Sequence, residues 1–168
     1  MTPLAAGAVT TRRLDLLPLR VEHAEEMAAV LSDPALHTFT GGAPDTAETL
    51  RSRYRRITAG PGDPAVSWLN WVIRLRAESC LTGYVQATVT GSVAEIAWVV
   101  GTPWQGRGIA TEAARALVDR LRRQPARTVI AHIHPDHRAS AAVARAAGLT
   151  PTDIWHDGEI RWSRPAPL

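Results

Sequence analysis

The sequence predicts a single α/β domain built on a mixed, mostly antiparallel sheet of about seven strands, with helices on both faces. Two observations support this fold class. In the middle of the chain, apolar segments rich in β-branched residues follow one another with only short turns between them, which is typical of an antiparallel meander. A long amphipathic helix pattern then connects the last of these segments to another apolar strand, and such a crossover implies a parallel pair.

The length of 168 residues suits one domain with its own core. Within it we expect residues 10–65 to hold a first strand and helices, residues 66–150 to form the central core, and residues 151–168 to form a terminal hairpin. No apolar run approaches the ~20 residues that span a bilayer, and residues 1–9 lack the basic start of a secretory signal. The sequence therefore predicts a cytoplasmic protein without a membrane partner.

The first part of the chain alternates between strand and helix patterns. Residues 12–18 are expected to form a strand, and residues 21–31 a helix whose apolar positions share one face. A second helix is expected to begin near Asp45, because Asp45 and Glu48 have the spacing of a capping box. Its apolar stripe consists of Ala47, Leu50, Tyr54 and Ile57.

The central part of the chain contains the meander and the crossover. Strands are expected over residues 67–76, 81–90 and 94–100. The crossover helix is expected from residue 106 to about residue 123, and a buried strand over residues 127–133 follows it.

The last part of the chain is expected to hold a helix and a hairpin. Asp136 can cap the helix at its start, and Gly148 suits the left-handed position after its end. The dipeptide Asp157-Gly158 separates residues 154–156 from residues 159–162, and it is typical of a tight hairpin turn.

The segment over residues 104–110 lies between a strand over residues 95–100 and the start of the crossover helix. Gly106 and Gly108 allow main-chain N–H groups to approach an anion closely. The helix N-terminus adds unpaired donors and a partial positive charge, and Arg107 can add a full charge. The segment therefore predicts a site that holds a pyrophosphate.

Two common phosphate-binding motifs do not match this segment. The phosphate loop of nucleotide triphosphatases needs a lysine, and the chain contains none. The dinucleotide fingerprint G-x-G-x-x-G finds only its first two glycines, because Thr111 occupies the place of the third.

Gln105, Gly108 and Ala110 give the pattern Q-x-x-G-x-A directly after a strand. This pattern resembles the acetyl-CoA loop of the GNAT superfamily of N-acetyltransferases, whose usual form is Q/R-x-x-G-x-G/A. A second segment, residues 134–149, is similar to the family's later strand-to-helix crossing. The opening residues 13–19 resemble the branch of ribosomal-protein N-terminal (RimJ/RimL-like) acetyltransferases. The resemblance spans nearly the whole chain.

The resemblance implies one N-acetyltransferase domain over residues 1–168, with acceptor-side helices in residues 10–65 and acetyl-CoA as the co-substrate in a core over residues 66–150. In the family, the strand before the loop and the strand after its helix splay apart. The pantetheine arm lies in the gap, and the loop amides take the pyrophosphate. By resemblance, the cofactor-binding residues are Trp98, Val99, Val100, Gln105, Gly106, Arg107, Gly108, Ile109, Ala110, Thr111, His137 and Ser140.

The same resemblance implies candidates for proton transfer. Glu95 aligns with a glutamate that some family members use as a general base, acting through water; its alternative role is an exposed carboxylate or an ion-pair partner for arginine. Ser140 is the candidate donor to the departing thiolate, and its alternative role is a hydrogen bond to the backbone. Ala144 stands where many relatives have a catalytic tyrosine, and His137 where they have an asparagine.

Metal and nucleic-acid sites are not favoured. His132 and His134 share one strand face with His137 nearby, but no cysteine or glutamate close in sequence completes a metal set. Arginine clusters at residues 51–56 and 120–123 offer an electrostatic surface to nucleic acid, yet the net charge is only +3. We interpret both clusters as solvated helix faces.

The leading hypothesis is an acetyl-CoA-dependent N-acetyltransferase that moves an acetyl group to a primary amine by direct attack in a ternary complex. The amine belongs either to a protein N-terminus or to a small molecule. The alternative is a non-catalytic acyl-CoA-binding sensor or regulatory subunit, which Ala144 and His137 keep open. The acceptor site is expected at the first helices, residues 36–44 and the terminal hairpin. Homodimers are common in the family, so a homodimer is compatible with the resemblance.

Overall fold

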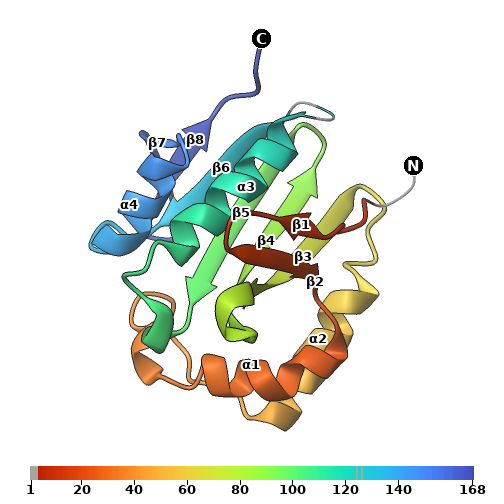
Figure 1. Cartoon of the computed structure of the whole chain (residues 1–168). Coiled ribbons are helices and arrows are strands. Elements are labelled where there is room, and N and C mark those ends of the chain that lie inside the picture. The colour runs from red at the N-terminus through yellow and green to blue at the C-terminus, as the bar shows by residue number, and fades with distance from the viewer. Residues whose placement is uncertain (1–3, 124, 126) are drawn as a thin grey trace.

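The computed structural model describes residues 4–123, 125 and 127–168, and it places an open sheet of eight strands between two helical layers (Figure 1). The strand order is β1-β2-β3-β4-β5-β6-β8-β7, and in these ranges only β5 and β6 run parallel. The predicted fold class is confirmed. The strand count exceeds the prediction because residues 9–18 form a two-residue strand, β1 (Val9–Thr10), paired with β2 (Leu14–Pro18).

The first helical segment begins at Val21 as predicted, with a 3-10 turn before the α-helix, whereas the second helix begins later than predicted. The N-cap of the second helix is Thr46, whose hydroxyl accepts the Thr49 N–H at 3.1 Å. The predicted capping box of Asp45 and Glu48 is therefore wrong, because the Asp45 carboxylate instead pairs with Arg53. The helical elements are η1 (Val21–His23), α1 (Ala24–Val30), η2 (Pro34–His37) and α2 (Ala47–Ala59).

The predicted antiparallel meander is confirmed. A bulge at Thr82 shifts the register after Ile73, and the buried Thr82 hydroxyl donates a hydrogen bond to the Ile73 carbonyl at 3.2 Å. Directly after the bulge, a Cβ atom on Gly83 would collide with the carbonyl oxygen of Val99, so only glycine lets the two strands approach this closely. The elements are β3 (Val66–Leu75), η3 (Arg76–Glu78), β4 (Cys80–Thr90) and β5 (Val93–Val100).

The crossover helix α3 (Ile109–Arg123) joins β5 to β6 (Thr128–Ile133), as predicted. It begins later than expected because Gly106 and Gly108 have φ angles of 75° and 76°, which lie outside the helical region. A 3-10 turn, η4 (Thr102–Trp104), precedes the two glycines.

The C-terminal part holds the predicted helix and hairpin, but the helix has a different start. Its N-cap is His137 with no side-chain cap, so the predicted Asp136 cap is wrong; Asp136 lies one residue too early. Gly148 has a φ of 87°, as predicted for the residue after the helix. Asp157 and Gly158 have φ angles of 49° and 79°, as a type I′ turn requires. The elements are α4 (Arg138–Ala146), β7 (Thr150–His156) and β8 (Glu159–Arg164).

Alternation along the strands gives each face of the sheet its own core. Trp71 and Ile73 pack in the larger core under α3 and α4, whereas Val72 packs in the smaller core under α1 and α2. Figure 1 shows α3 crossing in front of the sheet and α1 and α2 at its lower end. Within the ranges that the structure covers, no helix has the length and apolar character needed to cross a membrane.

Candidate functional site

The central strands separate into a fork. β5 and β6 pair from Val93 and Thr128 only as far as Glu95 and Ile130, although β5 continues to Val100. Figure 1 shows the two strands diverging toward the end from which α3 starts. In the described ranges, the edge of β5 beyond Glu95 therefore has no strand beside it. The sequence-predicted residues Trp98 and Val99 lie on this edge, and the Val100 carbonyl accepts a hydrogen bond from Gln105 Nε2 at 3.0 Å.

The loop after β5 brings a helix N-terminus to the open end of the fork. Gly106, Arg107 and Gly108 are exposed, and α3 starts directly after them. The N–H groups of its first turn, from Ile109 to Thr111, have no acceptor within the helix. Exposed glycine backbone followed by unpaired N–H groups is an arrangement that can bind an anion.

Arg13, directly before β2, and Glu112, in the first turn of α3, brace this loop. Arg13 Nε lies 2.7 Å from Glu112 Oε1, and Arg13 Nη1 donates to the Arg107 carbonyl at 2.9 Å. The other carboxylate oxygen of Glu112 accepts the Thr11 hydroxyl and the Arg13 N–H. Burial raises the pKa of Glu112, but the hydrogen bonds from Thr11 and Arg13 outweigh that effect and hold the pKa below its ordinary value. Sequence reasoning missed this pair, because 99 positions separate its members.

The Arg107 side chain is paired with a carboxylate outside the loop. Its guanidinium forms an ion pair with Glu78 in η3, and both side chains are partly exposed. The hydrogen bond from Arg107 holds the pKa of the Glu78 carboxyl below its ordinary value. To bind a phosphate, the Arg107 side chain has to leave Glu78.

The second sequence-predicted segment lies at the start of α4. Ser140 Oγ is 3.3 Å from His137 Nε2, so the serine contacts a side chain of its own segment and makes no backbone hydrogen bond in the part of the chain described. The His137 ring stacks on Phe39, with ring centroids 4.4 Å apart. Burial, together with His134, lowers the pKa of His137 and favours a neutral ring. Phe39 belongs to the connection between α1 and α2, and no sequence pattern predicts this contact.

Glu95 is the last residue of β5 that pairs with β6. Its side chain is half-exposed, and Oε1 lies 3.4 Å from Nδ1 of the buried His132. Across the residues that the structure describes, Glu95 forms no ion pair with an arginine, which was one of its expected roles.

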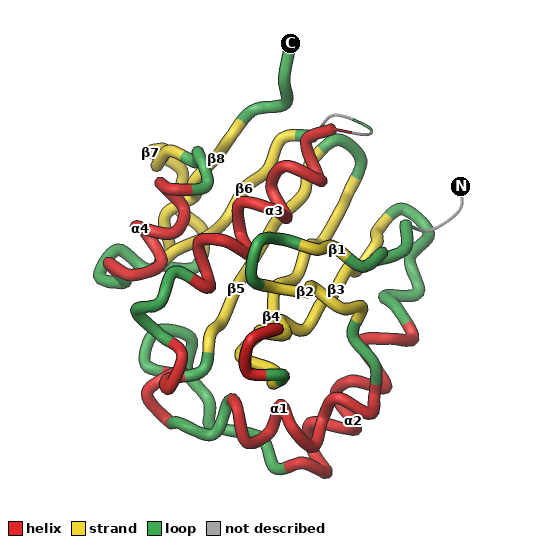
Figure 2. The backbone as a smooth tube through the Cα atoms, in the orientation of Figure 1, coloured by secondary structure: helices red, strands yellow, loops and turns green. Residues whose placement is uncertain are grey.

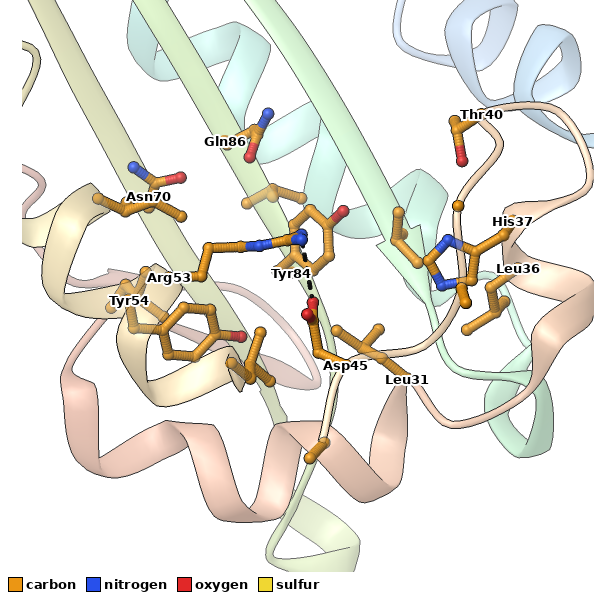
Figure 3. Close-up of a pocket in the computed structure, with 18 of the residues that line it drawn as sticks. Leu31, Leu36, His37, Thr40, Asp45, Arg53, Tyr54, Asn70, Tyr84 and Gln86 are labelled. Carbon is orange, nitrogen blue, oxygen red and sulfur yellow. Dashed lines mark ion pairs between the residues drawn. The ribbon is translucent and has the colours of Figure 1, made fainter. Parts of the chain in front are cut away.

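A cavity of about 450 Å³ lies on the sheet face that α1 and α2 cover (Figure 3). Asn70 and Gln86 point into it from neighbouring strands, and an ion pair between Asp45 and Arg53, 3.2 Å apart, crosses it. The first helices and residues 36–43 line the cavity, in line with the expected acceptor region, whereas the terminal hairpin does not contribute.

The polar groups of the cavity come from α2 and the segment before it, and from strands β3 and β4. Tyr84 and Tyr54 line it, and burial raises the pKa of both phenols, so both hydroxyls stay protonated. Sequence reasoning missed Asn70, Tyr84 and Gln86. The available signal was their alternation with apolar neighbours, which places polar side chains on the face opposite the larger core.

The cavity and the fork meet on β5. Val99 lines the cavity and also stands on the unpaired edge. Gln86, which lines the cavity, pairs with Ala97 on β5. Glu95 lies two residues before Ala97 on the same face of the sheet, about 7 Å away. Figure 2 shows the loop before α3 beside the connection between α1 and α2, and the Thr102 hydroxyl donates to Asp33 across them at 2.7 Å.

The histidines do not form a metal centre. His134 and His137 contact Phe39, whereas His132 contacts Arg161 and Glu95. In the described part of the chain, no three His, Cys, Asp or Glu side chains come together in a way that holds a metal ion.

Known proteins match this chain through its domain and its fold. The family model described as "Acetyltransferase (GNAT) domain" matches residues 13–150. No curated protein matches the sequence. A GNAT-family acetyltransferase from Bacillus anthracis shares 19% identity, with a TM-score of 0.79 and 95% of this chain and 99% of that chain covered.

Two further solved structures carry a bound cofactor. The ribosomal L7/L12 alpha-N-protein acetyltransferase RimL, in complex with coenzyme A, is 18% identical, with a TM-score of 0.77 and 95% and 98% of the two chains covered. The microcin C7 self-immunity acetyltransferase MccE, in complex with acetyl-CoA and AMP, is 17% identical, with a TM-score of 0.74 and 92% and 93% covered. At this identity the likeness establishes a shared fold.

Proposed function

The chain belongs to the GNAT family of acetyltransferases, and we propose that it moves the acetyl group of acetyl-CoA to a primary amine by direct attack in a ternary complex. The observation that carries the proposal is the meeting of two spaces at Val99. One is the cavity under α1 and α2, and the other is the open edge of β5. A cofactor arm along the edge and an amine in the cavity would bring thioester and nucleophile together there.

In this proposal acetyl-CoA lies along the fork. The pyrophosphate binds the N–H groups of residues 105–111, where Arg13 neutralises Glu112 and leaves the helix N-terminus positive. The pantetheine arm follows residues 98–100, with His137 and Ser140 on the other side of the fork. The cofactors bound by RimL and MccE support this choice of co-substrate.

The acceptor amine occupies the cavity. Its nitrogen attacks the thioester carbon, Glu95 takes the displaced proton through water, and the carbon–sulfur bond breaks. Ser140 protonates the departing thiolate, and its contact with His137 provides a route by which the hydroxyl regains a proton. An α-amine of pKa near 8 is already about a tenth free at pH 7, so the base supplies only about tenfold. Positioning contributes more, ~7 to 11 kcal/mol.

We further propose that residues 1–168 act as one N-acetyltransferase domain in the cytoplasm. A ribosomal-protein acetyltransferase among the similar structures supports this location. The cavity of about 450 Å³ is large enough for either type of acceptor, a protein N-terminus or a small-molecule amine. A homodimer stays a prediction from the family resemblance.

The test is calorimetric titration with acetyl-CoA, CoA and dephospho-CoA, followed by thiol release with a panel of amines. We expect binding of acetyl-CoA and CoA, and release of CoA with at least one primary amine. No binding would refute the assignment of the loop around Gly106 and Gly108.

The second candidate function is a non-catalytic acyl-CoA sensor. It is favoured by Ala144, which is fully buried and offers no hydroxyl where relatives use a catalytic tyrosine. Binding of acetyl-CoA without thiol release for any acceptor would select this candidate.

A further inference from the structure

His132 lies in a row of three side chains that crosses the sheet beside the fork. The row contains Glu95 on β5, His132 on β6 and Arg161 on β8, which are neighbouring strands in that order. The His132 side chain is only 7% exposed, whereas the Glu95 side chain is 51% exposed. The buried imidazole of His132 therefore lies between the exposed carboxylate of Glu95 and the guanidinium of Arg161.

Arg161 fixes the proton of this imidazole. Its Nε donates a hydrogen bond to His132 Nε2 at 3.1 Å, and Arg161 is the register partner of His132 in the β6–β8 ladder. Because a guanidinium only donates and stays charged, Nε2 has to be the acceptor. The ring proton of neutral His132 is then on Nδ1.

The Nδ1–H group of His132 lacks a hydrogen-bond acceptor among the residues that the structure describes. It is fully buried. Buried N–H groups almost always find a partner. The carboxylate oxygen that faces it is Glu95 Oε1, 3.4 Å away, and the half-exposed Glu95 side chain has the freedom to bring that oxygen into line.

We propose that His132, fixed by Arg161, is a positioning residue for Glu95. In the working complex Nδ1–H donates to one carboxylate oxygen of Glu95, and this bond holds the other oxygen toward the end of the cavity near Ala97. The inference rests on the proposed acetyl transfer with Glu95 as the base. Beyond that function, we infer that the Glu95 carboxylate acts in one orientation, which His132 on the neighbouring strand β6 sets.

The test is a double-mutant cycle that joins His132→Leu with Glu95→Gln, followed by single-turnover acetyl transfer to an α-amine. Each single variant is expected to slow transfer by about tenfold, the effect of the base itself. In the Glu95→Gln background, His132→Leu should slow transfer no further, because its partner has already lost its function. The dissociation constant for acetyl-CoA should stay the same in all four proteins.

Two conservative variants separate positioning from packing. The amide of His132→Asn places an N–H near the Nδ1 position, whereas His132→Gln reaches the Nε2 position and offers Arg161 a carbonyl. Transfer should recover in the Asn variant and stay slow in the Gln variant. His156→Leu is the matched control, because its exposed ring lies 5.0 Å from that of His132 on the same part of the sheet, and it should leave the rate unchanged.

Equal rate losses from His132→Leu with and without Glu95 would overturn the inference, as would equal rates for the Asn and Gln variants. Thermal unfolding of each variant identifies a loss that comes from misfolding. Failure of the unmodified protein to bind acetyl-CoA, or to acetylate any amine, would instead refute the proposed function and the inference together.

Discussion

The two sides of the fork are built in different ways. On the loop side, the groups proposed to bind are main-chain N–H groups within residues 105–111, beside the charged pair of Arg13 and Glu112. On the cavity side, the groups proposed to bind are side chains from α2, β3 and β4 in a largely apolar space. A backbone site binds a constant ligand in a fixed geometry, whereas a side-chain site is free to change its specificity without disturbing the fold.

The substitution Gly108→Trp is expected to have the largest effect on acetyl-CoA binding by the loop. We expect a loss of acetyl-CoA affinity of about 100-fold, because the new side chain fills the space of the anion and the φ of 76° disfavours any side chain. Calorimetry measures the loss. Gly62→Trp is the control, since it has a φ of 77° and open space around it but lies in a different loop. Equal affinity in both variants would refute the loop assignment.

The brace of the loop is the next target. Glu112→Gln removes the charge that holds Arg13 and weakens the hydrogen bonds from Thr11 and Arg13. We expect the free energy of unfolding to fall by about 1–3 kcal/mol. Chemical denaturation measures it. Glu48→Gln, an exposed first-turn glutamate of α2, should change it little. If the contacts of Glu112 do not stabilise the fold, the two variants will have the same free energy of unfolding.

The same variant gives the pH dependence a definite sign. The folded-state pKa of Glu112 lies below its ordinary value of 4.5, so its contribution to stability is complete above that value. It disappears as the pH falls through the folded-state pKa. The stability difference between the unmodified protein and Glu112→Gln should therefore be large at pH 7 and shrink under strongly acidic conditions. A constant difference would contradict this reading.

The cavity side responds to Arg53→Met and Asp45→Asn. Each breaks the ion pair that crosses the cavity, and we expect the KM for the acceptor to rise by about tenfold, the effect of one polar contact. The dissociation constant for acetyl-CoA should not change, because neither side chain reaches the loop. Arg55→Met, on the exposed side of α2, serves as the control. If acetyl-CoA affinity fell as well, the cavity and the loop would not be separate binding sites.

The ion pair between Arg107 and Glu78 lies at the border of the loop. Glu78→Gln releases Arg107 from its ion pair, so a phosphate no longer competes with Glu78 for the guanidinium. We expect acetyl-CoA affinity to rise about two- to threefold at low salt and to lose that gain at high salt, as for an exposed pair. A weaker affinity would mean that the pair itself holds the loop in its binding shape.

Sequence patterns predict those parts of the molecule whose cause is local. The meander, the crossover, the Asp157-Gly158 turn and the glycine loop each follow from a short run of residues. The predicted caps at Asp45 and Asp136 are wrong because each helix starts one residue or more further along the chain: Thr46 caps α2 while Asp45 pairs with Arg53, and α4 starts after His137 without a side-chain cap. A spacing rule contains no information about those contacts.

The missed parts of the candidate site share a different cause. Arg13 and Glu112 meet across 99 positions, and Phe39 reaches His137 from the opposite layer of the fold. Asn70 and Gln86 carry no motif, and only the register of β3 and β4 places them in one cavity. Such contacts depend on how the strands and helices are arranged in space, so they can be identified only when the strand order is known.

The stack of Phe39 on His137 joins the segment beside the cavity to the start of α4, where the proposed cofactor arm would lie. Phe39 belongs to the segment that borders the acceptor cavity, and His137 borders the place proposed for the cofactor arm. A cofactor that shifts the imidazole changes the energy of the acceptor-side segment. Linkage then requires reciprocity: whatever factor acetyl-CoA contributes to acceptor affinity, the acceptor returns to acetyl-CoA. Under the proposed function, the aromatic contact would therefore couple the two affinities by the same factor, whichever substrate binds first.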